Sequence, residues 1–600
     1  VFPRMKPALW SSGQTHVPME WRQEAGRVRL DWDGGLGGAM VFAVGGDTHA
    51  ALLDGWSGGS LEVEFPSGWA SKELWAVPVG AVMAPASVEY AEPGGLVTFQ
   101  GGADRLYIYP EGFEGAALSL FEPGSSSEAV CLTDIYDEFN GGVRDPWAIT
   151  AFLDFVLKAW EPAPVDVILC GGGHFDPRNR AGSRVSLIDP VRSPGDYFQD
   201  DLYAITKGTD VPQFAVSRIS TSDLAAFAIV ASRSAAYRSG AFAGAWQTRV
   251  LGAADDERSS QYSADETYHT NSMERILEEH LPDAARPVKH YMILYPFDSL
   301  FKKPEARQAF IDLWSEGALL VLFLGHGSFD QLADEGLFYL DDTGQLANSG
   351  RLPAAFFGSC RVGRFQDPGR DCIAQSVTTA PRGGAIVGIG ATFDTIGPVN
   401  ELLMAAFADA VFSQSGASLA SCLLAAKLQA GYSGLNNRVY VMFGDGSTMP
   451  AVPGHMHPVD ADTLFTGERS GFSGTAPHEG TVLLEAFESS RRRTYYTFRQ
   501  NLPIEYFDMP ALFFAGSAAA DPGFAAEAFV PVDADTGTRS RIQALVISPE
   551  GVSASAAWPH PLVPGMPSTT DSTGPSIEIW LEGFRSTEEP SVSGCATLSA

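Results

Sequence analysis

The chain has few of the features that mark disulfide-rich, zinc-finger or membrane proteins. Its 600 residues include only six cysteines, and none stands in a CxxC pair or at Cys/His zinc spacing. This excludes a disulfide framework and a zinc finger. No stretch approaches the roughly 20 apolar residues of a membrane-spanning helix. Any membrane association is therefore expected to run through a partner or a segment outside this sequence.

Positive charge is also scarce. There are 40 Lys and Arg residues against 72 Asp and Glu residues, which gives a formal net charge of −32. Nucleic acids and anionic membrane surfaces carry the same sign and would be repelled. The 45% hydrophobic and 11% aromatic residues are ample for packed cores. The composition therefore indicates a folded, acidic, multidomain protein that does not bind nucleic acid.

Two short apolar runs end on reactive side chains. Residues 319–324 lead into His326 and Gly327, and residues 354–358 lead into Cys360. Such runs are typical of strands buried on both faces of a parallel sheet, and ligands bind beyond the carboxyl ends of such strands. His326 and Cys360 are therefore predicted to be neighbours. Because only a thiolate is strongly nucleophilic, a nearby imidazole would activate the thiol.

Strand and helix patterns alternate through the middle of the chain. Strand-like runs at 165–170 and 248–253 stand among helical patterns at 148–160, 222–237 and 304–316. This alternation predicts βαβ units and a parallel sheet.

The patterns divide the chain into four predicted parts. Residues 1–104 are expected to form a β-rich and incomplete N-terminal domain. Residues 105–245 and 246–453 are expected to form two α/β subdomains, the second carrying His326 and Cys360. Residues 454–600 return to short strands between turn residues and predict a β-sandwich.

The order of motifs resembles the gingipain-type cysteine peptidases. Gly-His-Gly-Ser at 325–328, Ser-Cys at 359–360 and Pro-Arg-Gly-Gly at 381–384 follow that family's order. The likeness covers about residues 100 to 600, including Ile-Tyr-Asp-Glu-Phe at 135–139 and Phe-Val-Pro at 529–531. It is closer to the sortase branch of the type IX secretion system. The resemblance implies a caspase-like parallel-sheet core of two α/β subdomains with an immunoglobulin-like sandwich behind it.

The resemblance also assigns chemical roles. Cys360 would attack a peptide carbonyl, and His326 would form the thiolate pair or protonate the leaving amine. The N–H groups of Gly327 and Cys360 would stabilise the oxyanion. Asp255, which follows a strand-like run, matches the third member of the family's site, with Asp256 as the neighbouring candidate. A turn carboxylate that caps the strand end is the non-catalytic alternative.

Three further residues are candidates for binding substrate. An ungapped comparison places Glu266 where arginine-specific gingipains hold the carboxylate that selects a basic side chain, although a solvated loop carboxylate is the alternative. Ser328 and Ser359 flank the site and could hydrogen-bond substrate. Small residues are also what crowded strand ends require.

No cofactor is expected to be required. The resemblance leaves a structural calcium ion open, with Asp200, Asp201 and Asp445 as candidate ligands and structural caps or turns as the alternative. Three residues depart from the pattern that the resemblance implies. Gly172 stands where the family usually has Gly-Asp, Ser217 replaces a glycine, and Gly446 replaces a proline.

Three functions are compatible with the sequence. The first is an exported, cell-surface cysteine endopeptidase that removes C-terminal signal domains from secreted cargo and joins the product to a surface glycolipid amine. Its expected partners are outer-membrane secretion components. The second is a general secreted endopeptidase, and the third is a catalytically silent scaffold. Because the sequence starts at Val1 without a leader pattern, a signal peptide is expected to be removed or to lie upstream.

Overall fold

A computed structural model describes residues 94–565 apart from 194–196, 259–263 and 458, together with short strands nearer the two ends. The chain divides into two compact units, Val1–Glu92 and Pro93–Ala600. Within the described residues, no helix is both long and apolar enough to cross a membrane.

The first unit is built from strands. Four of them form an antiparallel sheet in the order β1-β6-β3-β4, and β2 pairs with β5. Their bounds are β1 (Thr15–Met19), β2 (Gly26–Asp31), β3 (Ala39–Gly45), β4 (His49–Leu53), β5 (Ser60–Phe65) and β6 (Lys72–Pro78). The predicted β-rich character of the N-terminal part is confirmed.

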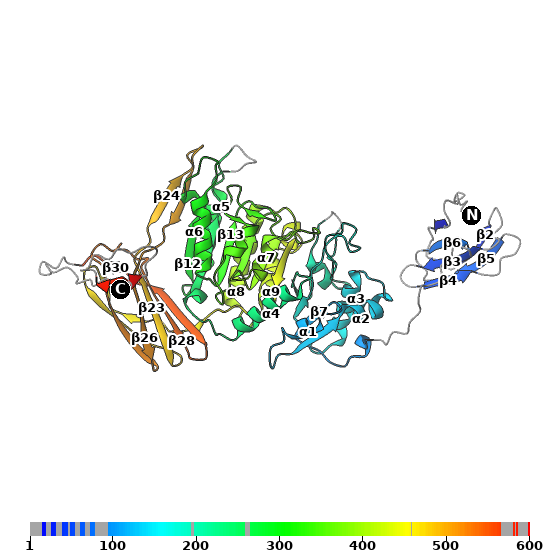
Figure 1. Ribbon diagram of the computed structural model, residues 1–600, viewed down its shortest axis with the longest axis horizontal. Helices are drawn as coiled ribbons and strands as arrows, with labels where there is room; N and C mark the ends of the chain where they lie inside the picture. Colours follow the sequence, from blue (N-terminus) through cyan, green and yellow to red (C-terminus); the bar gives the residue numbers. More distant parts are fainter. Residues whose placement is uncertain are drawn as a thin grey trace. The chain divides into compact units, whose positions relative to one another are not determined.

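A ten-stranded sheet forms the centre of the second unit (Figure 1). Its order is β12-β11-β13-β16-β17-β18-β10-β9-β7-β8, and all neighbours are parallel except β17 and β18. The strands are β7 (Arg105–Tyr109), β8 (Ser127–Cys131), β9 (Asp166–Leu169), β10 (Ala215–Arg218), β11 (Arg249–Ala254), β12 (Arg286–Tyr291), β13 (Leu320–Leu324), β16 (Ala354–Gly358), β17 (Val387–Ala391) and β18 (Tyr440–Gly444). This confirms the predicted α/β class with a mainly parallel sheet.

Strand β18 joins the two halves of the α/β region. It follows β17 in the chain and pairs with it antiparallel, yet its other neighbour is β10 of the first half. The segments predicted as two subdomains, 105–245 and 246–453, therefore share one continuous sheet. The four-part division itself stays a prediction.

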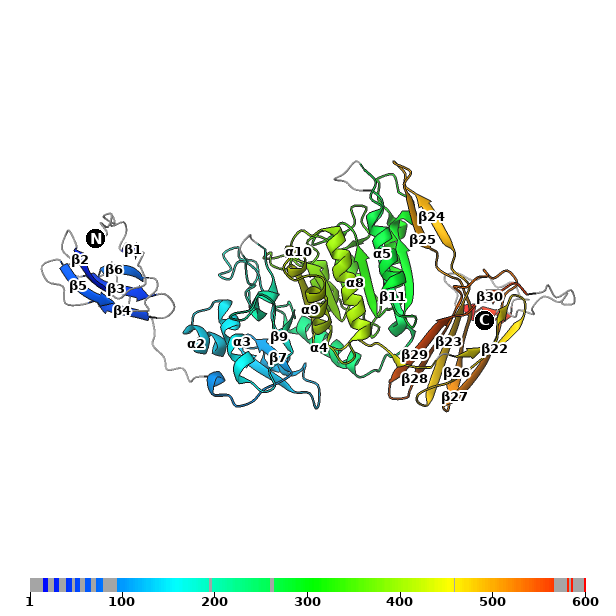
Figure 2. The same cartoon turned by 180° about the vertical axis from the view of Figure 1, so that it is seen from behind.

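Helices cover both faces of the sheet (Figures 1 and 2). They are α1 (Glu114–Leu118), α2 (Leu132–Asn140), α3 (Trp147–Ala159), α4 (Leu224–Arg238), α5 (Tyr268–Glu279), α6 (Pro304–Ser315), α7 (Ile373–Thr379), α8 (Gly397–Ser413), α9 (Leu419–Gln429) and α10 (Leu435–Arg438). In β13, Leu322 and Leu324 lie in the core formed with α5, α8 and α9, whereas Val321 and Phe323 lie in the core formed with α6 and α7. Because side chains alternate along a strand, both faces are apolar, which explains the unbroken apolar run.

The C-terminal part is β-rich, as predicted. A five-stranded sheet, β19-β29-β28-β23-β26, and a three-stranded sheet, β20-β22-β27, share one hydrophobic core. The strands after the α/β region are β19 (Gly454–His455), β20 (Asp460–Ala461), β21 (Leu464–Phe465), β22 (Arg469–Thr475), β23 (Gly480–Phe487), β24 (Arg492–Tyr496), β25 (Pro503–Phe507), β26 (Leu512–Ala520), β27 (Gly523–Phe529), β28 (Arg541–Ile547), β29 (Ser553–Pro559), β30 (Leu562–Val563), β31 (Trp580–Leu581), β32 (Phe584–Arg585) and β33 (Leu598–Ser599).

The hairpin β24–β25 projects from this β-rich part and lies beside α5 (Figure 2). The N–H of Phe507 donates to Glu274 on α5 at 2.7 Å. The C-terminal part therefore contacts the catalytic half of the α/β region directly.

Two of the residues expected to depart from the family pattern, Ser217 and Gly446, contact each other. The N–H of Gly446 donates to Ser217 Oγ at 3.0 Å, and a Cβ added at Gly446 would lie 2.6 Å from that hydroxyl. A proline at 446 would have no N–H to donate, and a glycine at 217 would have no hydroxyl to accept it. The hydrogen bond and the close packing therefore depend on the residue types at both positions.

Candidate active site

His326 and Cys360 lie at matching places on neighbouring strands. Leu324 of β13 pairs with Gly358 of β16 in the parallel ladder, and each reactive residue follows two positions later. Neighbouring strands lie about 4.8 Å apart. Both residues therefore lie just beyond the same edge of the sheet, on neighbouring strands.

The thiol of Cys360 is held by Thr395, in the segment between β17 and α8. The N–H of Thr395 donates to Sγ at 3.3 Å, and its carbonyl and hydroxyl oxygens lie 3.6 and 3.8 Å from the sulfur. Within the part of the chain that the structure describes, no hydrogen bond joins Sγ to His326.

The chain turns sharply after Cys360. Arg361 has φ 59°, a left-handed conformation that is uncommon for a residue with a side chain. Its N–H donates to the carbonyl of Phe393 at 3.1 Å, and its guanidinium pairs with Asp394 at 2.7 Å. These contacts hold a backbone conformation of the kind that clusters at functional sites.

The imidazole of His326 contacts Glu266. Nε2 lies 2.8 Å from Glu266 Oε2, and the side chain of His326 is 23% exposed. This hydrogen bond raises the pKa of His326 to about 9, against the opposing effect of burial. Burial raises the pKa of Glu266, but its hydrogen bonds to His269 and His326 outweigh burial and lower it to about 2. At neutral pH the pair is an imidazolium and a carboxylate.

A second histidine completes this cluster. His269, on the first turn of α5, has its ring 5.3 Å from that of His326 at an interplanar angle of 76°. Its Nε2 lies 3.6 Å from Glu266 Oε2. Its Nδ1 is buried without a hydrogen-bond partner among the described residues.

Asp255 supports the backbone of His326 and makes no hydrogen bond to its ring. Oδ2 accepts the N–H of His326 at 2.8 Å, and Oδ1 accepts the N–H of Asp256 at 2.9 Å. The side chain is buried, and burial raises its pKa well above the usual range, with Asp256 and Glu335 acting in the same direction. The structure thus gives Asp255 a place in the site different from the expected one, and Glu266 takes the position beside the ring.

Asp256 belongs to a buried charged group behind the site. It pairs with Lys303 at 2.8 Å, and both side chains are inaccessible to solvent. Carboxylate oxygens of Asp255, Asp256 and Glu335 lie within 4.8 Å of one another. Burial, followed by the charge of Asp256, raises the pKa of Glu335 to about 7.

The predicted oxyanion donors are available. No acceptor is found for the N–H of Gly327 or of Cys360 within the described segments. A Cβ at Gly327 would lie 2.5 Å from Ser359 Oγ, so only glycine fits there. Ser359 is buried against this glycine, and Ser328 donates to Asp330 at 2.6 Å. Ser359 therefore packs inside the protein, and Ser328 is hydrogen-bonded within its own loop.

The hairpin β24–β25 anchors the segment that carries Glu266. Asp265 Oδ2 accepts the N–H groups of Arg499 and Gln500 at 3.0 and 2.6 Å, and the N–H of Asp265 donates to Gln500 at 2.9 Å. Tyr495 donates to Glu257 at 2.9 Å. The connection between the hairpin strands therefore fixes Glu266 from the side of the β-rich part.

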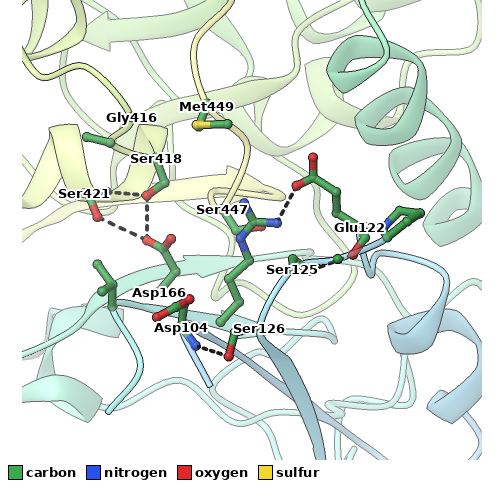
Figure 3. A pocket seen from close by; sticks show the side chains of 15 residues that line it. Asp104, Glu122, Ser125, Ser126, Asp166, Gly416, Ser418, Ser421, Ser447 and Met449 are labelled. Carbon is green, nitrogen blue, oxygen red and sulfur yellow. Dashed lines mark hydrogen bonds and ion pairs between the residues drawn. The ribbon is translucent and has the colours of Figure 1, made fainter. Parts of the chain in front are cut away.

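Two cavities lie near opposite edges of the sheet. One has a volume of about 820 Å³, and residues of the loops that follow β16 and β17 line part of it. Its lining includes Arg144, Arg178, Arg192, Arg364, Phe175, Gln366 and Phe393. The other, of about 660 Å³, surrounds Asp166 where β9 begins, and Ser418 and Ser421 bond that carboxylate (Figure 3). Neither His326 nor Cys360 is among the residues that line these two cavities.

A model of Peptidase family C25 matches residues 99–451 of the sequence. The chain belongs to Peptidase family C25. The matched residues contain the whole ten-stranded sheet with His326 and Cys360. Membership implies a cysteine peptidase, which confirms the predicted family and enzyme class.

Solved structures resemble this C25 peptidase at low identity. The Arg-specific cysteine proteinase gingipain R (RgpB) is 15% identical, with 77% of this chain and 98% of that one covered and a TM-score of 0.46. A complex of Porphyromonas gingivalis RgpB pro- and mature domains is also 15% identical. The match covers 76% of this chain and 99% of that one, with a TM-score of 0.46. Dimeric latent PorU from Porphyromonas gingivalis is 16% identical, with 95% of this chain and 54% of PorU covered and a TM-score of 0.43. No curated protein matches the sequence.

The three aspartates considered for calcium each pair with a different cation in this C25 peptidase. Asp200 pairs with Arg218, Asp201 with Lys427 and Asp445 with Arg238, at 2.7, 2.7 and 2.9 Å. These ion pairs join the three aspartates to strand β10 and to helices α4 and α9. Calcium binding by these residues stays a prediction.

Two residues of the site carried no signal in the sequence. Thr395 stands in an irregular segment four positions after β17, and its hydroxyl accepts a hydrogen bond from Asn400 at 3.0 Å. His269 lies in a polar stretch of α5. Its spacing of three residues from Glu266 would have placed both side chains on one side of a helical turn, which is the only hint available.

Proposed function

We propose that this C25 peptidase is an exported cysteine endopeptidase of the sortase type, which cleaves C-terminal signal domains from secreted cargo. The observation that carries the proposal is the matching placement of His326 and Cys360, two residues beyond a paired position of β13 and β16. A thiol and an imidazole at one sheet edge form the working pair of a cysteine peptidase.

The proposed reaction uses the contacts around these two residues. The Cys360 thiolate attacks the peptide carbonyl carbon, and the N–H groups of Gly327 and Cys360 hold the oxygen as it gains negative charge. The carbon–nitrogen bond then breaks, and the His326 imidazolium gives its proton to the departing amine. Glu266 keeps the imidazole protonated and oriented until that step.

The thioester left on Cys360 can be resolved in two ways. Water gives a free acid, and an amine gives a new amide bond. In either case the imidazole takes a proton from the attacking group. We propose that the amine of a surface glycolipid is the natural acceptor and that outer-membrane secretion components hold the enzyme at the cell surface. The projecting hairpin and the β-sandwich behind it support selection of a folded signal domain by surfaces beyond the cleft, because a single pocket contributes only about 1–3 kcal/mol of discrimination.

The decisive experiment compares substrates. The full chain should cleave a cargo protein that bears a type IX C-terminal domain, leave unfolded casein nearly intact, and yield more amide product when a suitable amine is added. Rapid casein digestion without any effect of signal domain or amine would reject the sortase and leave a general secreted endopeptidase. Absence of cleavage in every case would favour a silent scaffold.

A further inference from the structure

We propose that Glu266, His269 and His326 form a zinc-binding site that overlaps the catalytic pair and inhibits the peptidase when occupied. One carboxylate oxygen and two ring nitrogens from these residues lie within 4.8 Å of one another. They come from one segment at the start of α5 and from the end of β13. The sequence offered no sign of a metal site here, because His326 stands more than fifty residues after Glu266 and His269.

The distances suit a tetrahedral ion. Zinc binds imidazole nitrogen and carboxylate oxygen at about 2.0–2.2 Å, so two ligand atoms on a tetrahedral centre lie about 3.3 Å apart. Glu266 Oε2 lies 2.8 Å from His326 Nε2 and 3.6 Å from His269 Nε2. Side-chain shifts of about half an ångström would bring these two distances to the tetrahedral value. The two ring nitrogens lie within 4.8 Å of each other, and the ion would draw them to the same separation.

The ligand types select zinc over the hard cations. Calcium and magnesium prefer six or more oxygen ligands, whereas imidazole with one carboxylate is a usual zinc set. Three protein ligands leave the fourth position open to water. The charge of Asp334 also acts on His326, which favours a cation at this place.

His269 is prepared to act as a ligand. Its ring is buried, its Nε2 faces Glu266, and its Nδ1 has no partner among the described residues. No hydrogen bond at Nδ1 therefore fixes the tautomer, and Nε2 can present its lone pair. A metal on Nε2 of His326 would displace the proton held there against Glu266 and fix the ring, so the imidazole could no longer protonate the leaving amine.

The direct test is calorimetric titration of zinc sulfate into the full chain, freed of metal with EDTA and then dialysed. We expect one tight site per chain. His269→Gln should weaken zinc affinity at least tenfold. His280→Gln is the matched control, because His280 ends the same helix and pairs with Asp409 without a second histidine, and it should leave the affinity of that site unchanged.

Cys360→Ala separates this site from simple capture of zinc by the thiolate. We expect the alanine variant to keep the tight site. Loss of zinc binding in Cys360→Ala together with full binding in His269→Gln would overturn the proposal, as would absence of a tight site in the parent chain. Thermal melting of each variant without metal shows whether it is folded, and Glu266→Gln provides a second ligand variant if His269→Gln is not.

Inhibition is measured separately from binding. With each variant's rate in EDTA as its own reference, the zinc concentration for half inhibition should rise at least tenfold in His269→Gln and stay unchanged in His280→Gln. Activation of peptide cleavage by zinc would overturn the inhibitory role. The calorimetric result does not depend on the proposed sortase function, so failure of one leaves the other testable.

Discussion

Glu266 Oε2 lies 2.8 Å from Nε2 of His326, and this contact supplies the carboxylate that the imidazole needs. Asp255, the residue expected in that position, instead accepts the backbone N–H of His326. One histidine is therefore held twice, through its ring by a loop residue and through its main chain by the end of the neighbouring strand.

The first prediction concerns the ring contact. The pKa of His326 is raised from 6.5 to about 9, so the imidazolium persists at neutral pH and is lost as pH rises through about 9. Peptidase activity should fall on that alkaline side. Glu266→Gln removes the charge that holds the proton and should move this alkaline limb toward neutral pH by a unit or more.

The measurement is kcat/KM against pH, with EDTA in every buffer so that only protons bind the ring. Asp255→Asn retains an acceptor oxygen for the N–H of His326 and should shift the limb less, although Asp255, Asp334 and Glu266 all act on the ring. A larger shift in Asp255→Asn would return the orienting role to Asp255.

The second prediction tests the nucleophile. Cys360→Ala removes the thiol but little volume, and the contacts of Thr395 with sulfur are weak ones. Cleavage should fall to background, while the thermal midpoint stays within a few degrees of the parent value. Any cleavage by the purified variant above a mock preparation would contradict the assignment. Ser359→Ala, at the buried neighbouring position, serves as a control for local packing.

The third prediction concerns stability and pH. The pKa of Glu335 is raised from 4.5 to about 7, first by burial and then by Asp256. The folded state therefore favours the protonated acid. Below pH 4.5 Glu335 is protonated in both the folded and the unfolded protein, so it does not lower the free energy of unfolding. Between pH 4.5 and about pH 7 the free energy of unfolding falls, because the unfolded protein ionises Glu335 more readily. Glu335→Gln should then stabilise the protein above pH 7 by up to about 3 kcal/mol, since one pKa unit equals about 1.4 kcal/mol.

Urea unfolding at pH 8 and pH 4.5 checks this, and the gain should disappear at the lower pH. The exposed Glu305→Gln, on the first turn of α6, should change stability little at either pH. An equal gain for Glu335→Gln at both values would mean that repacking, and not ionisation, is responsible.

The fourth prediction concerns the pair that departs from the family pattern. Ser217→Gly leaves the buried N–H of Gly446 without its acceptor, which costs about 1–3 kcal/mol. Gly446→Pro alone would press the ring against the Ser217 hydroxyl. The double variant removes both conflicts, so its loss should be smaller than the sum of the single losses by about 1 kcal/mol or more. Additive losses in denaturant unfolding would show that the two positions are independent.

Much of the α/β region could be predicted from apolar patterns. The helix expected at 148–160 is α3 (Trp147–Ala159), and the one expected at 304–316 is α6 (Pro304–Ser315). The strands that end before His326 and Cys360 were equally clear, because burial on both faces demands unbroken apolar runs.

The contacts of the loop residues could not be predicted in the same way. Glu266 reaches the ring because its neighbour Asp265 is held in place. Asp265 accepts the backbone N–H groups of Arg499 and Gln500, more than 230 positions away in the chain. Nearly every residue type has a backbone N–H, so the sequence does not show which of these groups will donate. The same holds for Thr395, whose N–H, and not its side chain, makes the shortest contact with Cys360 Sγ.

The anchoring of Asp265 by the hairpin β24–β25 means that the active site extends past the boundary of its own family segment. The matched residues end at 451, while the donors that position the Glu266 segment lie at 499 and 500. A chain cut after the family segment would keep the nucleophile and the histidine and lose the outer support of the acid. Two C25 peptidases with identical strand ends can thus differ in pH optimum and metal sensitivity through a hairpin that lies outside the family segment.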